Sequence, residues 1–450
     1  MTPAATAGDA VLAHGVPTAQ PLPIPLSFAV TGAALALAVS FVILGLTWRR
    51  SRFRGDDSGR PLPQGLTRLV DSPATRWALR IVVLAFTLYV ALAAWMGRDS
   101  LENPVFGVVY VLLWVGLVPL SVLFGPVWSV VNPVRTLHRV LALVSRTDPD
   151  ADVRDLPRRL GQWPAVVGLY AFVWLELAAP DPSALGTVRL WFALYASAMI
   201  LGASVYGTRW FACADPFEMY SSLVGRLSPF GRRTDGRLVV RNPLANLDGM
   251  RPAPGLTAAM AVLLGSPAFD SIQGTTWWIR SVQSSPSNQV LLETLALSAC
   301  CLFVFITFSG AAMSSGLAGG QGTTQLTSLP DRYAHSLVPI IVGYVVAHYL
   351  TLLVIVGQQT VVRLSDPLSR GWNVFGTADL SLSNDLLAHP TAIATTQVLA
   401  VVTGHVLGVV SAHDRAVRLL PTGVARRGQL PLLAGMIVYT VGGLLLLFLA

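Results

Sequence analysis

Residues 339–356 read Pro339-Ile-Ile-Val-Gly-Tyr-Val-Val-Ala-His-Tyr-Leu-Thr-Leu-Leu-Val-Ile-Val. This apolar run contains one ionisable group, His348, and about 20 such residues are enough for a helix to cross a bilayer. The stretch therefore predicts a transmembrane helix. An ionisable side chain is costly in hydrocarbon, so His348 is a candidate functional residue.

The whole chain has the composition of an integral membrane protein. Of its 450 residues, 53% are hydrophobic and 12% are charged, and the mean hydropathy is +0.60. We predict an all-α, polytopic transmembrane helix bundle, in which 24–450 forms a single transmembrane domain after an exported tail, 1–23. About ten spans are expected, at residues 24–47, 77–96, 105–124, 163–179, 187–206, 256–272, 288–312, 334–356, 391–412 and 430–450. The sixth is the weakest, because Gly265-Ser266-Pro267 is predicted to break it.

The arginine positions predict the orientation of the helices. All 31 basic residues are Arg, and 25 of them fall in one alternate set of loops while 4 fall in the other. Basic residues favour the cytoplasmic side, so the first set is assigned to the cytoplasm. Both termini are then outside, and the protein is predicted to be a multi-pass protein of the plasma membrane, with the lipid bilayer as its surroundings.

Several classes of function are disfavoured by the sequence. The net charge of +8 comes from Arg at the ends of apolar runs and not from a basic module, so no nucleic-acid partner is expected. The three cysteines have neither disulfide nor zinc spacing. No Walker loop, nucleophile elbow or His-Glu-x-x-His is present, and no loop is long enough for a separate catalytic domain. Any chemistry is therefore expected in the bundle or on its loops.

A faint internal repeat is also present. The pattern Gly-x-x-Trp ends three spans, at Gly45–Trp48, Gly125–Trp128 and Gly207–Trp210. The tryptophans are explained either as interfacial anchors or as marks of a duplicated helix-pair unit. After the second and third copies, Asn132-Pro133 and Asp215-Pro216 each place a capping side chain before a proline at the first helical position.

The segments that follow these two caps are amphipathic. We predict that both form helices lying in the cytoplasmic interface, with Arg toward anionic lipid and His138 on the wet face. Further along, residues 228–255 are rich in Pro, Gly and Arg, with a turn at Asp235-Gly236. A small hairpin and a linker are both compatible with that composition.

Four ionisable residues in or near apolar spans are candidate metal ligands: Asp270, Glu293, His348 and His405. Carboxylate and imidazole groups suit a divalent ion such as Zn or Mn, which could turn a bound water into a nucleophile. Other interpretations stay open. The acids could lie at headgroup depth, the histidines could bond neighbouring helices, and a bis-His haem would need two histidines at equal depth.

Four stretches carry a family resemblance: Gly125–Arg135, Leu264–Asp270, Asp366–Gly376 and Gly404–Arg415. They resemble polytopic actinobacterial membrane proteins known as fenitrothion hydrolase, and the likeness covers most of the chain. The resemblance implies a membrane-bound activity on an organophosphate ester, with a further membrane protein as partner in a complex. It implies no catalytic residues.

Three functions remain in competition. The first is a membrane-embedded, metal-dependent organophosphate ester hydrolase, which the family resemblance favours. The second is a membrane transporter or metal-handling permease, which an interrupted sixth span would favour because broken helices often build transport sites. The third is a non-catalytic membrane subunit.

Overall fold

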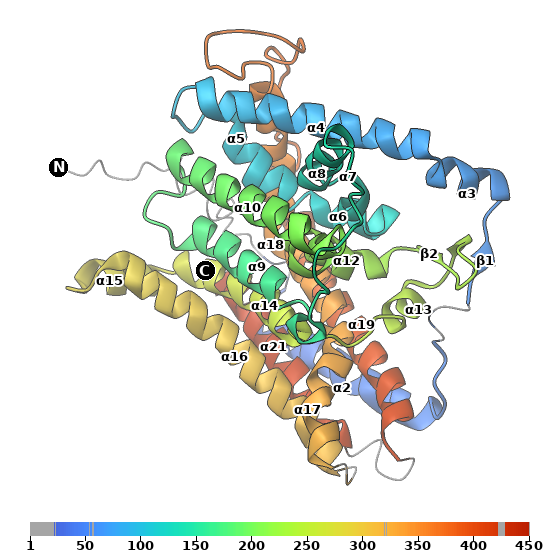
Figure 1. The fold of residues 1–450 in the computed structure, drawn as a ribbon. Coiled ribbons are helices and arrows are strands. Elements are labelled where there is room, and N and C mark those ends of the chain that lie inside the picture. Colours follow the sequence, from blue (N-terminus) through green and yellow to red (C-terminus); the bar gives the residue numbers. More distant parts are fainter. Residues whose placement is uncertain are drawn as a thin grey trace. The chain divides into compact units, whose positions relative to one another are not determined.

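The computed structural model describes residues 22, 24–53, 55, 58–318, 320, 322–421 and 428–449. Over these residues the chain is an all-α, polytopic helix bundle, as predicted (Figure 1). Nine helical segments of the described part are long and apolar enough to cross a membrane. They are α2 (Leu26–Thr47), α4 (Pro73–Met96), Pro104–Phe124, Arg158–Leu177, α10 (Leu185–Tyr206), α16 (Gln289–Ala318), Gln325–Arg363, α19 (Pro390–Leu419) and Leu430–Phe448.

Three of these spanning segments join several helices. Pro104–Phe124 contains α5 (Pro104–Phe106), a π-helical stretch (Gly107–Leu113) and α6 (Leu117–Phe124). Arg158–Leu177 contains α9 (Trp163–Leu177). The third, Gln325–Arg363, joins α17 (Thr323–Tyr333) to α18 (Val338–Arg363). The last of the nine, Leu430–Phe448, is the single helix α21 (Leu430–Leu449). Apart from residue 22, the predicted exported tail lies outside the described residues.

The sixth predicted span forms a helix, α14 (Leu256–Gln273), but it is not among the nine. The prediction that Gly265-Ser266-Pro267 breaks this span is wrong, because the helix continues through Pro267. A broken sixth span therefore gives no support to a transporter. Gly265 instead allows close packing on α16: a Cβ there would lie 2.6 Å from the Cα of Cys301. Most of α14 is buried, so it is a protein-enclosed helix rather than one surrounded by lipid.

The chain divides into two compact units. Unit 1 contains Leu62–Gly225 and Tyr349–Asn384. Unit 2 contains the described residues of Pro17–Pro61, Arg226–His348 and Asp385–Ala450.

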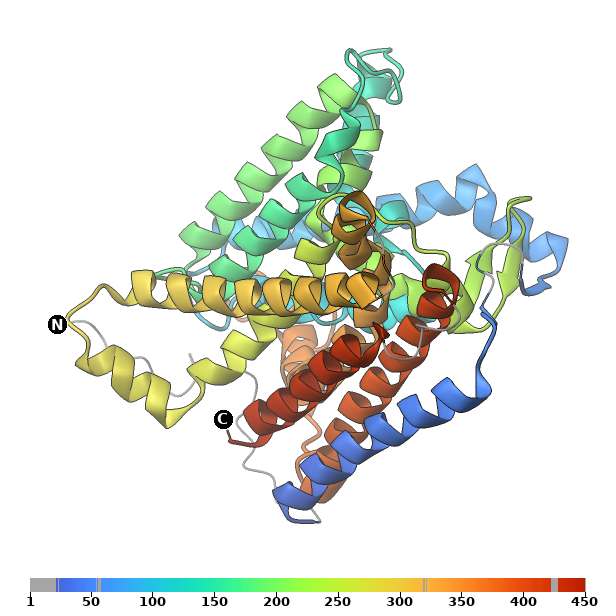
Figure 2. The ribbon, with the colours of Figure 1, turned by 90° about the horizontal axis from the view of Figure 1, so that it is seen from below.

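In unit 2, helices α2, α19 and α21 pack against one another, and Figure 2 shows them side by side. The buried cluster between them joins Ala33, Ala347 (on α18), Val401 and Leu444. Dispersion between closely approaching helices stabilises such contacts, because lipid removes the hydrophobic driving force. Unit 2 also holds a three-stranded antiparallel sheet in the order β1–β3–β2. Its strands are β1 (Arg60–Pro61), β2 (Phe230–Arg232) and β3 (Leu238–Val240), so the predicted 228–255 segment includes a hairpin.

Unit 1 is built around two matching segments. In the first, α6 ends at Gly125, α7 (Trp128–Val131) follows, and α8 (Pro133–Val144) begins after the Asn132 cap. In the second, α10 ends at Gly207, α11 (Arg209–Ala214) follows, and α12 (Pro216–Val224) begins after the Asp215 cap. Both glycines have positive φ, +87° and +64°, which favours glycine at each turn. The second and third Gly-x-x-Trp copies therefore belong to a duplicated unit.

The two copies contact each other through equivalent positions. Asn132 Nδ2 donates to Asp215 Oδ2 over 2.7 Å, so cap meets cap. Three residues further on, Arg135 forms an ion pair with Glu218, donating to both carboxylate oxygens at 2.7 and 2.6 Å. The backbone N–H of Trp128 donates to Ser221 Oγ, and the ring of Phe211 meets His138 edge-on. Asn132 and Asp215 hold equivalent positions in the two copies, and so do Arg135 and Glu218. The Trp128–Ser221 contact in turn corresponds to the Phe211–His138 contact with the two copies exchanged. The copies are therefore related by an approximate two-fold rotation.

The pairing of the two copies places the two predicted interfacial helices differently from the prediction. Nearly every residue of α12 is buried, so α12 is a core helix and not a surface one. In α8, Leu141 and Val144 are exposed while His138 is only 7% exposed, so the prediction that His138 faces water is wrong. The physical reason is the pairing of the two copies, which places the polar side of α8 against protein and leaves its apolar side outward.

Candidate functional site

The structure places two of the four candidate residues in direct contact. Asp270 lies in the last turns of α14 and His348 in the first half of α18, and both belong to unit 2. His348 Nε2 and Asp270 Oδ2 are 2.9 Å apart. The Asp270 side chain is 1% exposed and that of His348 is 11% exposed. A carboxyl and an imidazole thus form a hydrogen-bonded pair, called here the Asp270–His348 pair, among apolar helices.

A tyrosine and a serine hold the imidazole in place. Tyr344 is one turn before His348 on α18, where i,i+4 side chains meet, and the two rings stack with centroids 5.7 Å apart. The Tyr344 hydroxyl is 2.8 Å from Ser271 Oγ, next to Asp270 on α14. Our sequence analysis missed these two residues, although their spacing from His348 and Asp270 was a usable signal.

The pair joins two groups that can each bind a proton. A hydrogen bond between a carboxyl and an imidazole carries one proton between two groups that can each hold it, and adding or removing one proton changes the charge of the pair as a whole. Histidine is the side chain that changes charge most readily near neutral pH. This arrangement suits proton transfer, orientation of the imidazole as a base, or orientation of a metal-binding histidine by the carboxylate.

Glu293 and His405 have other neighbours. Glu293 lies on α16 and accepts a hydrogen bond from Gln289 Nε2, 2.8 Å away. His405 is 2% exposed on α19, and its Nδ1 lies 2.9 Å from the carbonyl of Val401 on the same helix. Within the described residues, no three His, Cys, Asp or Glu side chains gather as a metal-ligand group. The Asp270–His348 pair fits two positions of the predicted Zn or Mn site, and the metal itself stays a prediction.

Two further histidines, His335 and His413, make hydrogen bonds to other parts of unit 2. His335 Nε2 lies 3.3 Å from the carbonyl of Ser411, and His413 Nε2 lies 3.1 Å from that of Trp48. The neighbouring Asp414 accepts from the indole N–H of Trp48 and the backbone N–H of Arg52. His413 and Asp414 thus join the chain at the end of α2 to α19, and His335 joins the turn before α18 to α19, which is a structural use of polar residues.

Comparisons with known proteins add no relative to this description. A scan against protein-family models, a search of curated proteins and a search of solved structures each found no match to the chain.

Proposed function

We propose that this multi-pass membrane protein is a permease that moves protons through the Asp270–His348 pair. The observation that carries the proposal is the 2.9 Å contact between the two ionisable side chains inside an apolar helix bundle. Ionisable groups are rare within membrane helices and typically mark ion paths and proton relays.

A purely structural role accounts less well for this pair. Two other contacts between spanning helices of unit 2 use non-ionisable groups: Gln397 Nε2 donates to the carbonyl of Ala347 over 2.9 Å, and Tyr439 and Thr307 pair their hydroxyls. An amide or hydroxyl would join α14 and α18 without the desolvation penalty of ionisable groups. The choice of Asp with His therefore supports a role that needs a proton.

The proposal is tested with purified protein in liposomes that contain a pH-sensitive dye. A potassium gradient with valinomycin sets the membrane potential, and proton entry is followed by fluorescence. We expect wild-type protein to raise proton flux above that of empty liposomes, and Asp270→Asn and His348→Gln each to lower it at least tenfold. His405→Gln is the matched control, because it removes a buried histidine outside the pair, and it should keep the wild-type flux. Wild-type flux equal to that of empty liposomes would overturn the proposal.

A metal-dependent ester hydrolase is the second candidate. The family resemblance supports it, and so does the geometry of the pair, since a carboxylate bonded to an imidazole commonly orients a metal-binding histidine. The test is release of a nitrophenol from an organophosphate triester, with Zn or Mn added and then removed by a chelator. Hydrolysis that needs the metal and is lost in His348→Gln, without proton flux, would favour the hydrolase over the permease.

A further inference from the structure

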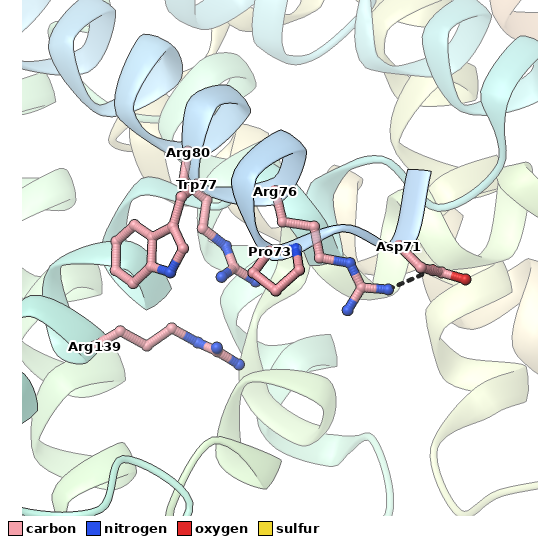
Figure 3. Close-up of a pocket in the computed structure, with 6 residues that line it drawn as sticks. All are labelled: Asp71, Pro73, Arg76, Trp77, Arg80 and Arg139. Carbon is pink, nitrogen blue, oxygen red and sulfur yellow. Dashed lines mark hydrogen bonds and ion pairs between the residues drawn. The ribbon is translucent and has the colours of Figure 1, made fainter. Parts of the chain in front are cut away.

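A second polar site lies in unit 1, at the start of α4. A cavity of about 200 Å³ is lined by Asp71, Pro73, Arg76, Trp77, Arg80 and Arg139 (Figure 3). Asp71 is the last residue of helix α3 (Gln64–Asp71), the next four lie in the first turns of α4, and Arg139 comes from α8. Figure 3 shows the three guanidinium groups directed toward one space beside the start of α4.

The cavity carries more positive charge than its own residues neutralise. Its three Arg face one carboxylate, Asp71, which accepts from Arg76 Nη2 at 2.6 Å. Arg80 is only 7% exposed, and its Nε donates to the carbonyl of Val130. Arg139 Nε is buried and has no hydrogen-bond partner among the described residues. Like charges held this close repel, and a bound anion with several acceptor oxygens would relieve that repulsion.

The helices beside the cavity have the features of helices at a membrane surface. On α3, Leu66, Leu69 and Val70 are 42%, 60% and 41% exposed. The α8 helix exposes Leu141 and Val144. Amphipathic helices that expose an apolar face lie at the boundary of headgroups and acyl chains, and tryptophans such as Trp77 are enriched there.

We propose that this cavity binds the phosphate of an anionic phospholipid. Guanidinium groups bind phosphate oxygens through two parallel hydrogen bonds, and a lipid would place its phosphate in the cavity and its acyl chains against the exposed leucines. The arginine count assigns this end of α4 to the cytoplasmic side, where anionic lipids concentrate in many membranes. The ligand chemistry is a phosphate, and its source in this proposal is lipid rather than free phosphate.

The experiment measures the thermal stability of the full chain in mixed micelles that contain either phosphatidylglycerol or phosphatidylcholine. We expect phosphatidylglycerol to raise the Tm of the wild type more than phosphatidylcholine does, with a half-maximal lipid concentration at least fivefold higher in Arg139→Gln. Arg80→Gln should behave alike, but Arg80 also bonds Val130, so Arg139→Gln is the decisive variant. Arg68→Gln is the control: Arg68 lies on α3 but does not line the cavity, and its lipid response should match that of the wild type.

Three results would overturn the lipid assignment. Equal responses to the two lipids would exclude a headgroup preference. A response that Arg139→Gln leaves unchanged would place binding elsewhere. A Tm increase with inorganic phosphate alone, matching that of phosphatidylglycerol and lost in Arg139→Gln, would assign the cavity to free phosphate.

Discussion

Units 1 and 2 each bury an aspartate at the end of a hydrogen bond, but the partners differ. Asp215 in unit 1 accepts from Asn132 Nδ2, from the Tyr195 hydroxyl and from two backbone N–H groups. Asp270 in unit 2 is 2.9 Å from the imidazole of His348. The donors to Asp215 are two backbone N–H groups, an amide and a phenol, whereas the partner of Asp270 is an imidazole, which can bind a proton.

Under the proposed function, the difference separates a structural carboxyl from one that transfers protons. Asp215 caps α12 and joins the two copies of the unit 1 repeat, so its hydrogen bonds hold the fold together. Burial raises the pKa of Asp215, and the four hydrogen bonds oppose that shift. Asp270, by contrast, is paired with an imidazole, which can bind and release a proton. We therefore expect substitutions in unit 1 to change stability most and substitutions in the pair to change activity most.

The largest expected effect comes from reversing a charge at the repeat. Arg135→Glu would place a second carboxylate against Glu218 in a buried position, and loss of a buried ion pair costs about 3 to 5 kcal/mol. The two positions are equivalent in the two copies, so Arg135→Glu combined with Glu218→Arg should recover at least half of the lost unfolding free energy. Titration with a denaturing detergent measures all three variants. A double variant no more stable than Arg135→Glu alone would contradict the equivalence.

The next effect concerns the Asp215 cap. Asp215→Ala leaves two backbone N–H groups, Asn132 and Tyr195 without their acceptor, which should lower the unfolding free energy by about 3 kcal/mol. The exposed Asp155 is the matched control, and Asp155→Ala should change it by less than about 0.5 kcal/mol. The same detergent titration gives both values. Equal stability of the two variants would show that Asp215 is not a structural centre.

Substitutions in the Asp270–His348 pair should lower activity strongly and stability only slightly. Asp270→Asn keeps a side chain of the same size that can still bond His348, so we expect a change in unfolding free energy of about 1 kcal/mol or less. Proton flux in liposomes should fall at least tenfold in the same variant. If Asp270→Asn unfolds the protein as Asp215→Ala does, the contrast between the two carboxyls fails.

The smallest expected effect is a pH dependence of the stability of the unit 1 repeat, caused by His138. Burial, with Arg139 and Arg135 nearby, lowers the pKa of His138. The folded protein therefore favours neutral His138. This preference causes no loss of stability above the unfolded pKa of about 6.5, and the unfolding free energy falls as the pH drops below that value. Between pH 7 and pH 5, the Tm of the wild type should fall about 2 °C further than that of His138→Gln. Parallel pH profiles would show that His138 does not contribute.

The sequence was sufficient to predict the helices and to single out two residues of the candidate site, but not the contact between them. Apolar runs marked the nine spanning segments, and Gly125, Gly207 and the two caps marked the repeat, because turn and cap chemistry is local. Asp270 and His348 were singled out as ionisable groups in apolar helices, and they meet although 78 residues separate them.

The errors have one physical origin, which is packing between helices. An apolar face can be covered by lipid or by protein, and periodicity does not distinguish the two, so the burial of α12 and His138 was missed. Gly265 was interpreted as a break because close approach to Cys301 depends on a partner helix. For the same reason, Glu293 and His405 could not be separated from the other candidates by sequence alone.

The most direct test of the central claim is infrared difference spectroscopy of the protein in lipid between pH 5 and pH 8. If the Asp270–His348 pair exchanges a proton, the wild type shows a pH-dependent carboxyl band, which disappears in Asp270→Asn and changes its midpoint in His348→Gln. Asp215→Asn should keep the band. A spectrum without such a band in the wild type, or with a band that Asp270→Asn leaves intact, would contradict the account.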